Sequence, residues 1–177
     1  MVAMSVATSR SRLDDRLASL VDLERSREFH EGRLSLDLGR MAGLLAALPD
    51  LPWPRVGVHV AGSEGKTSTS ELIAVGLRGH GLRVATYTSP HLRDTRERLR
   101  LDGAFPDDAL LDHAQVLVDR AARAAGVQPS YFEYLTALAR VVFAEARVDA
   151  VVWETGLGGR LDATRLMRAD LCVVTTI

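Results

Sequence analysis

The stretch "VGVHVAGSEGKTSTSELIAVGLRGHG", Val56 to Gly81, contains a predicted strand, a glycine turn and a predicted helix in immediate succession. The valine-rich run Val56–Val60 is typical of a buried strand. From Thr67 to about His80 the residues favour a helix, which Gly81 would close. A strand that leads directly into a helix indicates the first unit of a parallel α/β sheet.

The turn between these two elements has the composition of a phosphate-binding loop. Gly62 and Gly65 let the backbone curl around an anion, and the N–H groups at a helix N-terminus attract negative charge. Lys66 is the only lysine among 22 Lys+Arg residues. We interpret it as a compact, mobile charge for the β- and γ-phosphates, a task for which the planar fork of arginine is less suited. The strict pattern G-x-x-x-x-G-K-[ST] is not met at Val60, so a merely structural turn is the alternative.

Two further strand ends are expected beside this loop, because the carboxyl ends of parallel strands gather at one edge of a sheet. Glu154 directly follows the apolar stretch "DAVVW", and with a hydroxyl at Thr67 or Ser68 it predicts a Mg²⁺ site. Ser89 follows the predicted strand Arg83–Tyr87. The alternatives are a capping or ion-paired carboxylate at Glu154 and a plain surface turn at Ser89.

The remaining pattern completes an α/β domain with a mostly parallel sheet and helices on both faces. The segment from 88 to 103 is polar and irregular, with a short strand expected at "ERLRL". Helical spacing predicts helices over 12–24, 34–48, 107–125 and 130–146, and the buried-type strands are 56–60, 83–87, 149–153 and 171–177. Ser130 with Glu133 fits a capping box at the start of the last helix.

Composition excludes several classes of partner. The formal net charge is -1 and aromatic residues make up 5% of the chain, so a nucleic-acid surface is not expected. No apolar run reaches the length of a membrane span. The single cysteine, Cys172, and an N-terminus unlike a signal peptide favour a cytoplasmic setting. We expect Cys172 to be a buried apolar filler, His59 a satisfied core histidine, and the arginines at 93, 96, 98 and 100 a solvated face.

Three motifs in order, "HVAGSEGKTS", "YTSPHLRDTRERLRLDG" and "ETGLGGRLDAT", with "YFEYLTALA" between the last two, resemble the folylpolyglutamate synthase and dihydrofolate synthase family of the Mur ligase group. The resemblance covers nearly the whole chain. It implies the P-loop NTPase-like fold of a Mur ligase central domain, ATP and Mg²⁺ as cofactors, and addition of L-glutamate to a dihydropteroate or folate carboxylate through an acyl phosphate. A Mur-type cell-wall precursor ligase and a non-catalytic nucleotide-binding module are the alternatives.

The resemblance also implies roles for single residues. Lys66 and Glu154 match the catalytic lysine and glutamate. Nucleotide contacts are implied for Gly62, Ser63, Glu64, Gly65, Lys66, Thr67 and Ser68. Metal contacts are implied for Thr67 or Ser68, Ser89 and Glu154, and substrate contacts for Ser89, Pro90, His91, Phe132 and Asp162. From the residues alone, Phe132 fits the core as well, and Asp162 fits a capping role as well.

The sequence departs from the family pattern at the loop and in length. Glu64 replaces an asparagine beside the anion site, Thr67 replaces a glycine, and Arg165 replaces a further asparagine. A metal-binding histidine, a modified lysine and a C-terminal domain are not found in residues 1–177. We therefore expect the chain to be an N-terminal ATP-binding piece whose glutamate and nucleotide sites a C-terminal domain completes, and to be inactive by itself.

Overall fold

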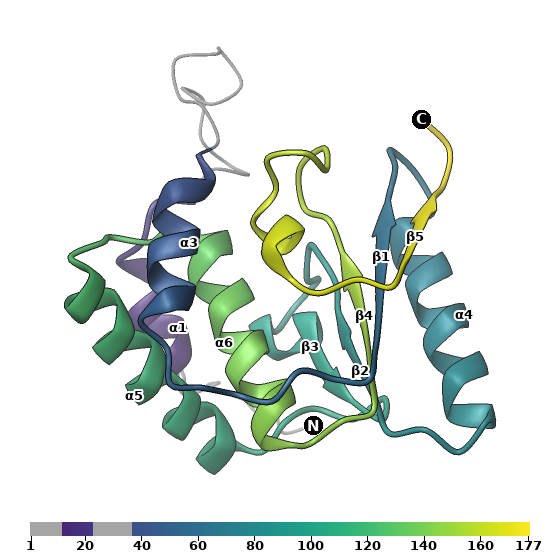
Figure 1. The fold of residues 1–177 in the computed structure, drawn as a ribbon, viewed down its shortest axis with the longest axis horizontal. Coiled ribbons are helices and arrows are strands. Elements are labelled where there is room, and N and C mark those ends of the chain that lie inside the picture. The colour runs from purple at the N-terminus through teal and green to yellow at the C-terminus, as the bar shows by residue number, and fades with distance from the viewer. Residues whose placement is uncertain (1–11, 23–36) are drawn as a thin grey trace, which may run out of the picture.

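The computed structural model describes residues 12–22 and 37–177, and its centre is a five-stranded sheet (Figure 1). In the described residues the strand order is β3-β2-β4-β1-β5. The bounds are β1 Val56–Ala61, β2 Val84–Tyr87, β3 Leu99–Leu101, β4 Ala150–Glu154 and β5 Leu171–Val174. Four of these strands run parallel, and β3 pairs antiparallel with β2. The predicted α/β class and mostly parallel sheet are confirmed.

Helices lie on both faces of the sheet, as predicted (Figure 1). Helix α4 (Lys66–Gly79) covers one face, where Ala74 packs with Val58, Val60 and Val152. The other face carries α6 (Tyr131–Glu145), behind which lie α5 (Asp108–Ala125), α3 (Leu38–Ala46) and α1 (Arg12–Ala18). The two short 3₁₀ helices are η1 (Thr95–Arg98) and η2 (Ala163–Leu166). Because α6 lies between the sheet and the outer helices, nearly all of its residues are buried.

Helix ends follow the signals in the sequence. The Ser130 backbone N–H donates to Glu133 Oε2 at 2.7 Å, and the Ser130 hydroxyl accepts from the Glu133 N–H at 3.3 Å, so the capping box is confirmed. Helix α5 ends at Gly126 in the left-handed conformation. Helix α1 is shorter than expected and ends at Ala18, since the Ser19 hydroxyl donates to the Arg16 carbonyl and competes with the helix. Residues 23, 24 and 34–36 of the two expected N-terminal helices lie outside the described residues.

Three predictions about the last strand are wrong: where it ends, its burial, and Cys172 as a buried apolar filler. Strand β5 ends at Val174 rather than at 177, and it is not buried: Leu171 is 56% exposed and Val174 60%. Cys172 is exposed as well. Among the described strands β5 pairs on one side only, with β1, so its apolar side chains lie at an edge of the sheet. An apolar run of four residues does not distinguish an edge strand from a central one.

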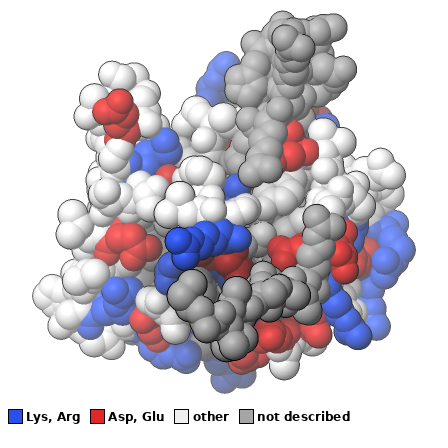
Figure 2. Space-filling view, turned by 180° about the vertical axis from the view of Figure 1, so that it is seen from behind, with Lys and Arg blue, Asp and Glu red and all other residues white. Residues whose placement is uncertain are grey.

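The side of the molecule drawn in Figure 2 shows no large gathering of basic side chains over the described residues. On the side drawn in Figure 2, basic and acidic side chains are interspersed over the described residues rather than gathered by sign. This distribution agrees with the formal net charge of -1. Within the described ranges, no helix has the length and hydropathy that crossing a membrane requires.

Candidate functional site

The loop between β1 and α4 depends on glycine at two positions. Gly62 has φ +144°, and a Cβ there would lie 2.0 Å from the Thr175 hydroxyl oxygen, so no larger residue fits. Gly65 has φ +75° and stands at the N-cap of α4, where no side chain of the described residues accepts from the first helical N–H groups. These N–H groups have no acceptor within the helix either. The start of α4 therefore offers a set of backbone donors to an anion.

Lys66 is the first residue of α4 and lies over this loop. Its Nζ donates to the carbonyl oxygen of Gly62 at 2.9 Å and lies 3.4 Å from that of Ser63. These two carbonyls are the ammonium group's partners in the described residues. Phosphate oxygens would be stronger acceptors for the same group, because a charged acceptor strengthens a hydrogen bond. The lysine is thus held at the mouth of the loop, in the place that the sequence predicts.

Glu154 ends β4 beside the loop and is 1% exposed. Its Cα is in register with that of Val60, near the end of the neighbouring strand β1. The Thr67 hydroxyl lies 3.0 Å from each carboxylate oxygen of Glu154. Thr67 rather than Ser68 is therefore the hydroxyl that the structure brings to this carboxylate.

Burial raises the pKa of Glu154 to about 7, because a charge is costly to remove from water. The Thr67 hydroxyl, the Lys66 charge, the Ser89 backbone N–H and the Arg98 charge oppose this rise in the pKa. The fully buried carboxylate has one hydroxyl close by and no cation in direct contact in the described part of the chain. A metal ion bound there would compensate the buried negative charge.

The donor set fits Mg²⁺ together with a nucleotide. Within the described residues no group of three His, Cys, Asp or Glu side chains could hold a metal by itself. Mg²⁺ characteristically takes one or two protein ligands and completes its shell with phosphate oxygens and water. Thr67 and Glu154 supply such a partial shell beside the helix N-terminus. The residues present therefore suit a magnesium–phosphate group better than an isolated metal ion.

Ser89 and its neighbours border the same edge of the sheet. Ser89 is buried, its backbone N–H acts to lower the pKa of Glu154, and its peptide bond to the exposed Pro90 is cis. His91 is half-buried, and its Nδ1 accepts from Arg98 Nε at 3.0 Å. The structure thus groups Ser89 with Lys66, Thr67 and Glu154, whereas a direct metal contact by its hydroxyl stays a prediction.

Arg98 corrects an expectation, since the arginines from 93 to 100 were expected to form a solvated face. Arg98 is 3% exposed, and its guanidinium lies over the ring of Tyr131 with 5.3 Å between the carbon and the centroid. Its charge acts on Glu154. The alternation of charges in "RDTRERLRL" hides which arginine turns inward. The only signal is its place directly before the apolar Leu99, at the start of β3.

Phe132 and Asp162 shape the loop after β4. A Cβ on Gly156 would lie 2.6 Å from the Phe132 ring, so this loop approaches the ring closely. Asp162 is 2% exposed and accepts from the backbone N–H groups of Gly156 at 3.0 Å, Leu157 at 2.9 Å and Thr164 at 2.9 Å. These bonds agree with the capping role for Asp162. Substrate contacts by either side chain stay predictions.

His59 is buried as expected, with 8% of its surface exposed, but it is not fully satisfied. Its Nε2 has no hydrogen-bond partner in the described part of the chain. Burial lowers the pKa of His59, which favours the neutral ring.

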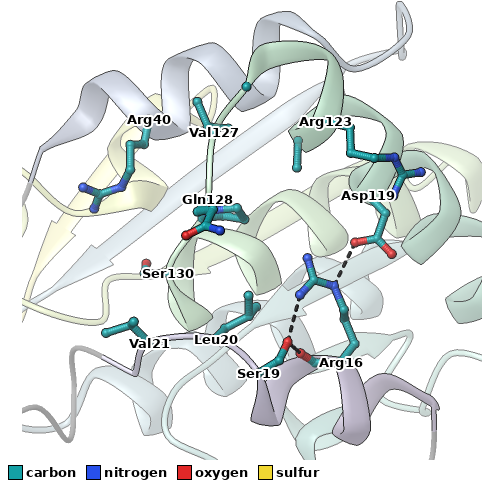
Figure 3. A pocket seen from close by; sticks show the side chains of 13 residues that line it. Arg16, Ser19, Leu20, Val21, Arg40, Asp119, Arg123, Val127, Gln128 and Ser130 are labelled. Atoms are coloured by element: carbon teal, nitrogen blue, oxygen red, sulfur yellow. Dashed lines mark hydrogen bonds and ion pairs between the residues drawn. The ribbon is translucent and has the colours of Figure 1, made fainter.

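A separate cavity of about 750 Å³ opens between α1, α5 and the start of α6 (Figure 3). Arg16, Arg40, Arg123, Asp119 and Ser130 are among its lining residues. Arg16 is engaged with Asp119 at 2.9 Å, as the dashed line shows. No residue of the 62–68 loop lines this cavity. Ser130, the N-cap of α6, lines this cavity, whereas Phe132 in the first turn of the same helix lies against the loop at Gly156.

These features define an α/β domain of the phosphate-loop class. A strand leads through a glycine turn into a helix, a lysine is the first helical residue, and a buried carboxylate ends the adjacent strand. No family model matches the chain. Curated relatives do match it. The dihydrofolate synthase/folylpolyglutamate synthase of Mycobacterium tuberculosis is 34% identical over 178 residues, which cover 92% of this chain and 36% of that protein. The Escherichia coli protein of the same name is 38% identical over 150 residues, covering 84% and 35%.

Over the region that it spans, the chain belongs to the dihydrofolate synthase/folylpolyglutamate synthase family. The structure of Escherichia coli FolC in complex with DHPP and ADP superposes with a TM-score of 0.80 at 34% identity, over 93% of this chain and 38% of that one. A Mycobacterium tuberculosis folylpolyglutamate synthase complexed with ADP and AMPPCP gives a TM-score of 0.72 at 31% identity, over 86% and 36%. The chain thus spans little more than a third of the relatives that it matches.

Proposed function

We propose that this chain is the ATP-binding part of a ligase that adds L-glutamate to the carboxylate of a pteroate or folate. The observation that carries the proposal is the cluster of Lys66, Thr67 and Glu154 at the phosphate loop. The relatives support the substrates: one solved structure holds DHPP and ADP, and another is a folylpolyglutamate synthase/dihydrofolate synthase with Mn, AMPPNP and L-glutamate bound.

Each residue of the cluster has a task in binding ATP. The first N–H groups of α4 donate to phosphate oxygens, and Lys66 places its charge on the β- and γ-phosphates. Thr67 and Glu154 hold Mg²⁺, which when bound neutralises negative charge on the phosphates. Gly62, Ser63, Glu64 and Gly65 form the curved backbone, and Ser68 continues the helix behind it.

The substrate carboxylate is a poor electrophile, and phosphorylation by ATP makes it reactive. A substrate carboxylate oxygen attacks the γ-phosphorus of ATP, the bond from this phosphorus to the β,γ-bridging oxygen breaks, and ADP leaves. The amine of L-glutamate then attacks the carbonyl carbon of the acyl phosphate. Inorganic phosphate leaves with the bonding electron pair, and the ammonium proton passes to solvent. Lys66 assists the first step by stabilising charge that moves onto the β,γ-bridging oxygen.

The proposed contacts for the pteroate or folate are Ser89, Pro90, His91, Phe132 and Asp162. Residues of a C-terminal domain are expected to complete the glutamate and nucleotide sites, and for this reason the 177 residues are expected to lack turnover. A cytoplasmic setting belongs to the same proposal. A Mur-type ligase acting on cell-wall precursors is less favoured, since the relatives found are folate enzymes.

Titration calorimetry of the 177-residue chain with ATP and Mg²⁺ tests the nucleotide site. Wild type, Lys66→Ala and Lys66→Arg are compared, and Arg123→Ala, which removes an exposed cation away from the loop, is the matched control. We expect binding by the wild type and the control, loss in Lys66→Ala, and weakened binding in Lys66→Arg. Equal affinity in all four proteins would refute the role of Lys66.

Turnover separates the ligase from the binding module. The chain, and a longer protein that contains it, are mixed with dihydropteroate, L-glutamate and ATP, and ADP release is measured. Substrate-dependent ADP release by the longer protein supports the ligase. Binding without any release, in both proteins, would favour a nucleotide-binding module.

A further inference from the structure

The segment that follows β5 holds the phosphate loop from the side opposite to β4. The Thr175 backbone N–H donates to the Ala61 carbonyl at 2.8 Å, and the Ser63 N–H donates to the Thr176 carbonyl at 2.7 Å. Glu64 and Thr176 form an isolated antiparallel bridge. The loop is therefore paired with residues more than a hundred positions away, over its whole first half.

The Thr175 side chain adds a contact that the backbone does not provide. Its hydroxyl lies 2.6 Å from the Glu64 carbonyl oxygen and 3.3 Å from that of Ala61. A hydroxyl has one hydrogen to donate, and the shorter distance assigns it to Glu64. The same oxygen fills the space where a side chain at Gly62 would stand. Gly62 and Thr175 thus fit together closely.

This contact fixes the direction of one peptide group. The peptide bond is planar and trans, so the carbonyl of Glu64 and the N–H of Gly65 point in opposite directions. With its carbonyl turned toward Thr175, the Glu64–Gly65 peptide turns its N–H away from Thr175. The Ser63 N–H is already engaged by Thr176 and is not available to an anion.

We infer that Thr175 is a positioning residue of the phosphate loop, whose hydroxyl holds the Glu64 carbonyl and so presents the Gly65 N–H to a nucleotide phosphate. The inference rests on the proposed function, since it requires a phosphate at this loop. It also gives Glu64 a role through its backbone: the side chain is exposed, while the carbonyl is held.

Three forms of the ¹⁵N-labelled chain test this: wild type, Thr175→Val, which removes only the hydroxyl, and Thr175→Ser, which retains it. Each is titrated with ADP and, as a phosphate-free control, with adenosine, and amide spectra report affinity and the Gly65 signal. We expect ADP to bind Thr175→Val about tenfold more weakly. This is the size of effect expected when the hydrogen bond from the Gly65 N–H to a phosphate oxygen is lost. Thr175→Ser should stay within about twofold of wild type, and adenosine should bind all three alike.

The outcomes separate the inference from the proposed function. No ADP binding by wild type would overturn both. Equal ADP binding by wild type and Thr175→Val would overturn the inference alone, and so would equally weak binding by Thr175→Val and Thr175→Ser. If Thr175→Val does not fold, the wild-type spectra decide: the Gly65 amide signal must shift on ADP addition and stay in place on adenosine addition, and its failure to do so overturns the inference.

Discussion

Replacing Glu154 with glutamine tests whether this buried carboxyl destabilises the chain when it is ionised. Glu154 is 1% exposed, and its close polar neighbours are the Thr67 hydroxyl and the Ser89 backbone N–H. Burial raises the pKa of its carboxyl from 4.5 to about 7. Glutamine has nearly the same shape, and its amide oxygen accepts from the same hydroxyl, so the substitution removes the charge and little else.

The sign follows from the proton bound by each state. Between pH 4.5 and about 7 the folded chain holds a proton on Glu154 that the unfolded chain has released. Stability from this group is therefore fully present below pH 4.5 and is lost as pH rises through about 7. A shift of this size corresponds to a loss of about 3 kcal/mol in the free energy of unfolding.

His59 contributes a pH dependence of stability of the opposite sign, and the comparison must cancel this contribution. Burial lowers the pKa of His59 below 6.5, so the stability that its neutral form contributes is present above that pH and is lost as pH falls. Because Glu154→Gln retains His59, the difference between the two proteins cancels this contribution. Sites far from Glu154 cancel in the same way.

Urea unfolding of both proteins at pH 5 and pH 8, without divalent metal, gives the required free energies. Relative to wild type, Glu154→Gln should gain about 2.5 kcal/mol between the two pH values, because part of the total is already lost at pH 5. With nucleotide present at pH 8, Mg²⁺ should stabilise wild type more than Glu154→Gln. A difference between the proteins that is the same at pH 5 and pH 8 would refute the raised pKa.

Three further substitutions test the surroundings of the site by thermal and urea unfolding. Gly156→Ala places a methyl group 2.6 Å from the Phe132 ring and should cost about 1–3 kcal/mol, and an unchanged midpoint would contradict that close approach. Asp162→Ala leaves three backbone N–H groups without their acceptor and should cost about 3 kcal/mol or more, unlike Asp162→Asn, which retains one acceptor oxygen. Arg140→Met removes a guanidinium that lies 3.9 Å from the centroid of Trp53 and should lower stability by about 1–2 kcal/mol, with quenching of Trp fluorescence by added iodide increasing as that ring becomes more mobile.

Local patterns in the sequence predict the elements that depend on local signals. Gly62, Gly65 and Lys66 mark the phosphate loop because turn geometry and helix starts depend on neighbouring residues. The capping box at Ser130 is found for the same reason. The sequence predicts that Glu154 lies beside the phosphate loop, because the residue directly follows an apolar strand and the ends of parallel strands share one edge of the sheet.

Features that depend on distant pairing are missed. Strand β5 is as apolar as a central strand, and its position at the edge is set by the order of the strands. Arg98 turns inward because Tyr131, from another element, offers it a ring. Thr175 gives no signal at all, since its partner Glu64 lies 111 residues earlier.

The strand order explains how a loop shorter than the strict phosphate-loop pattern is held in shape. Strand β1 lies between β4 and β5, so two neighbours end beside the loop that leaves it. From β4, Glu154 reaches Thr67 on the helix side; from beyond β5, Thr175 reaches Glu64 on the opposite side. A turn with few residues has few internal hydrogen bonds, and here both flanks supply them from other strands. The proposed phosphate site thus depends on three adjacent strands, and substitutions at Glu154 or Thr175 should weaken it although neither residue belongs to the loop.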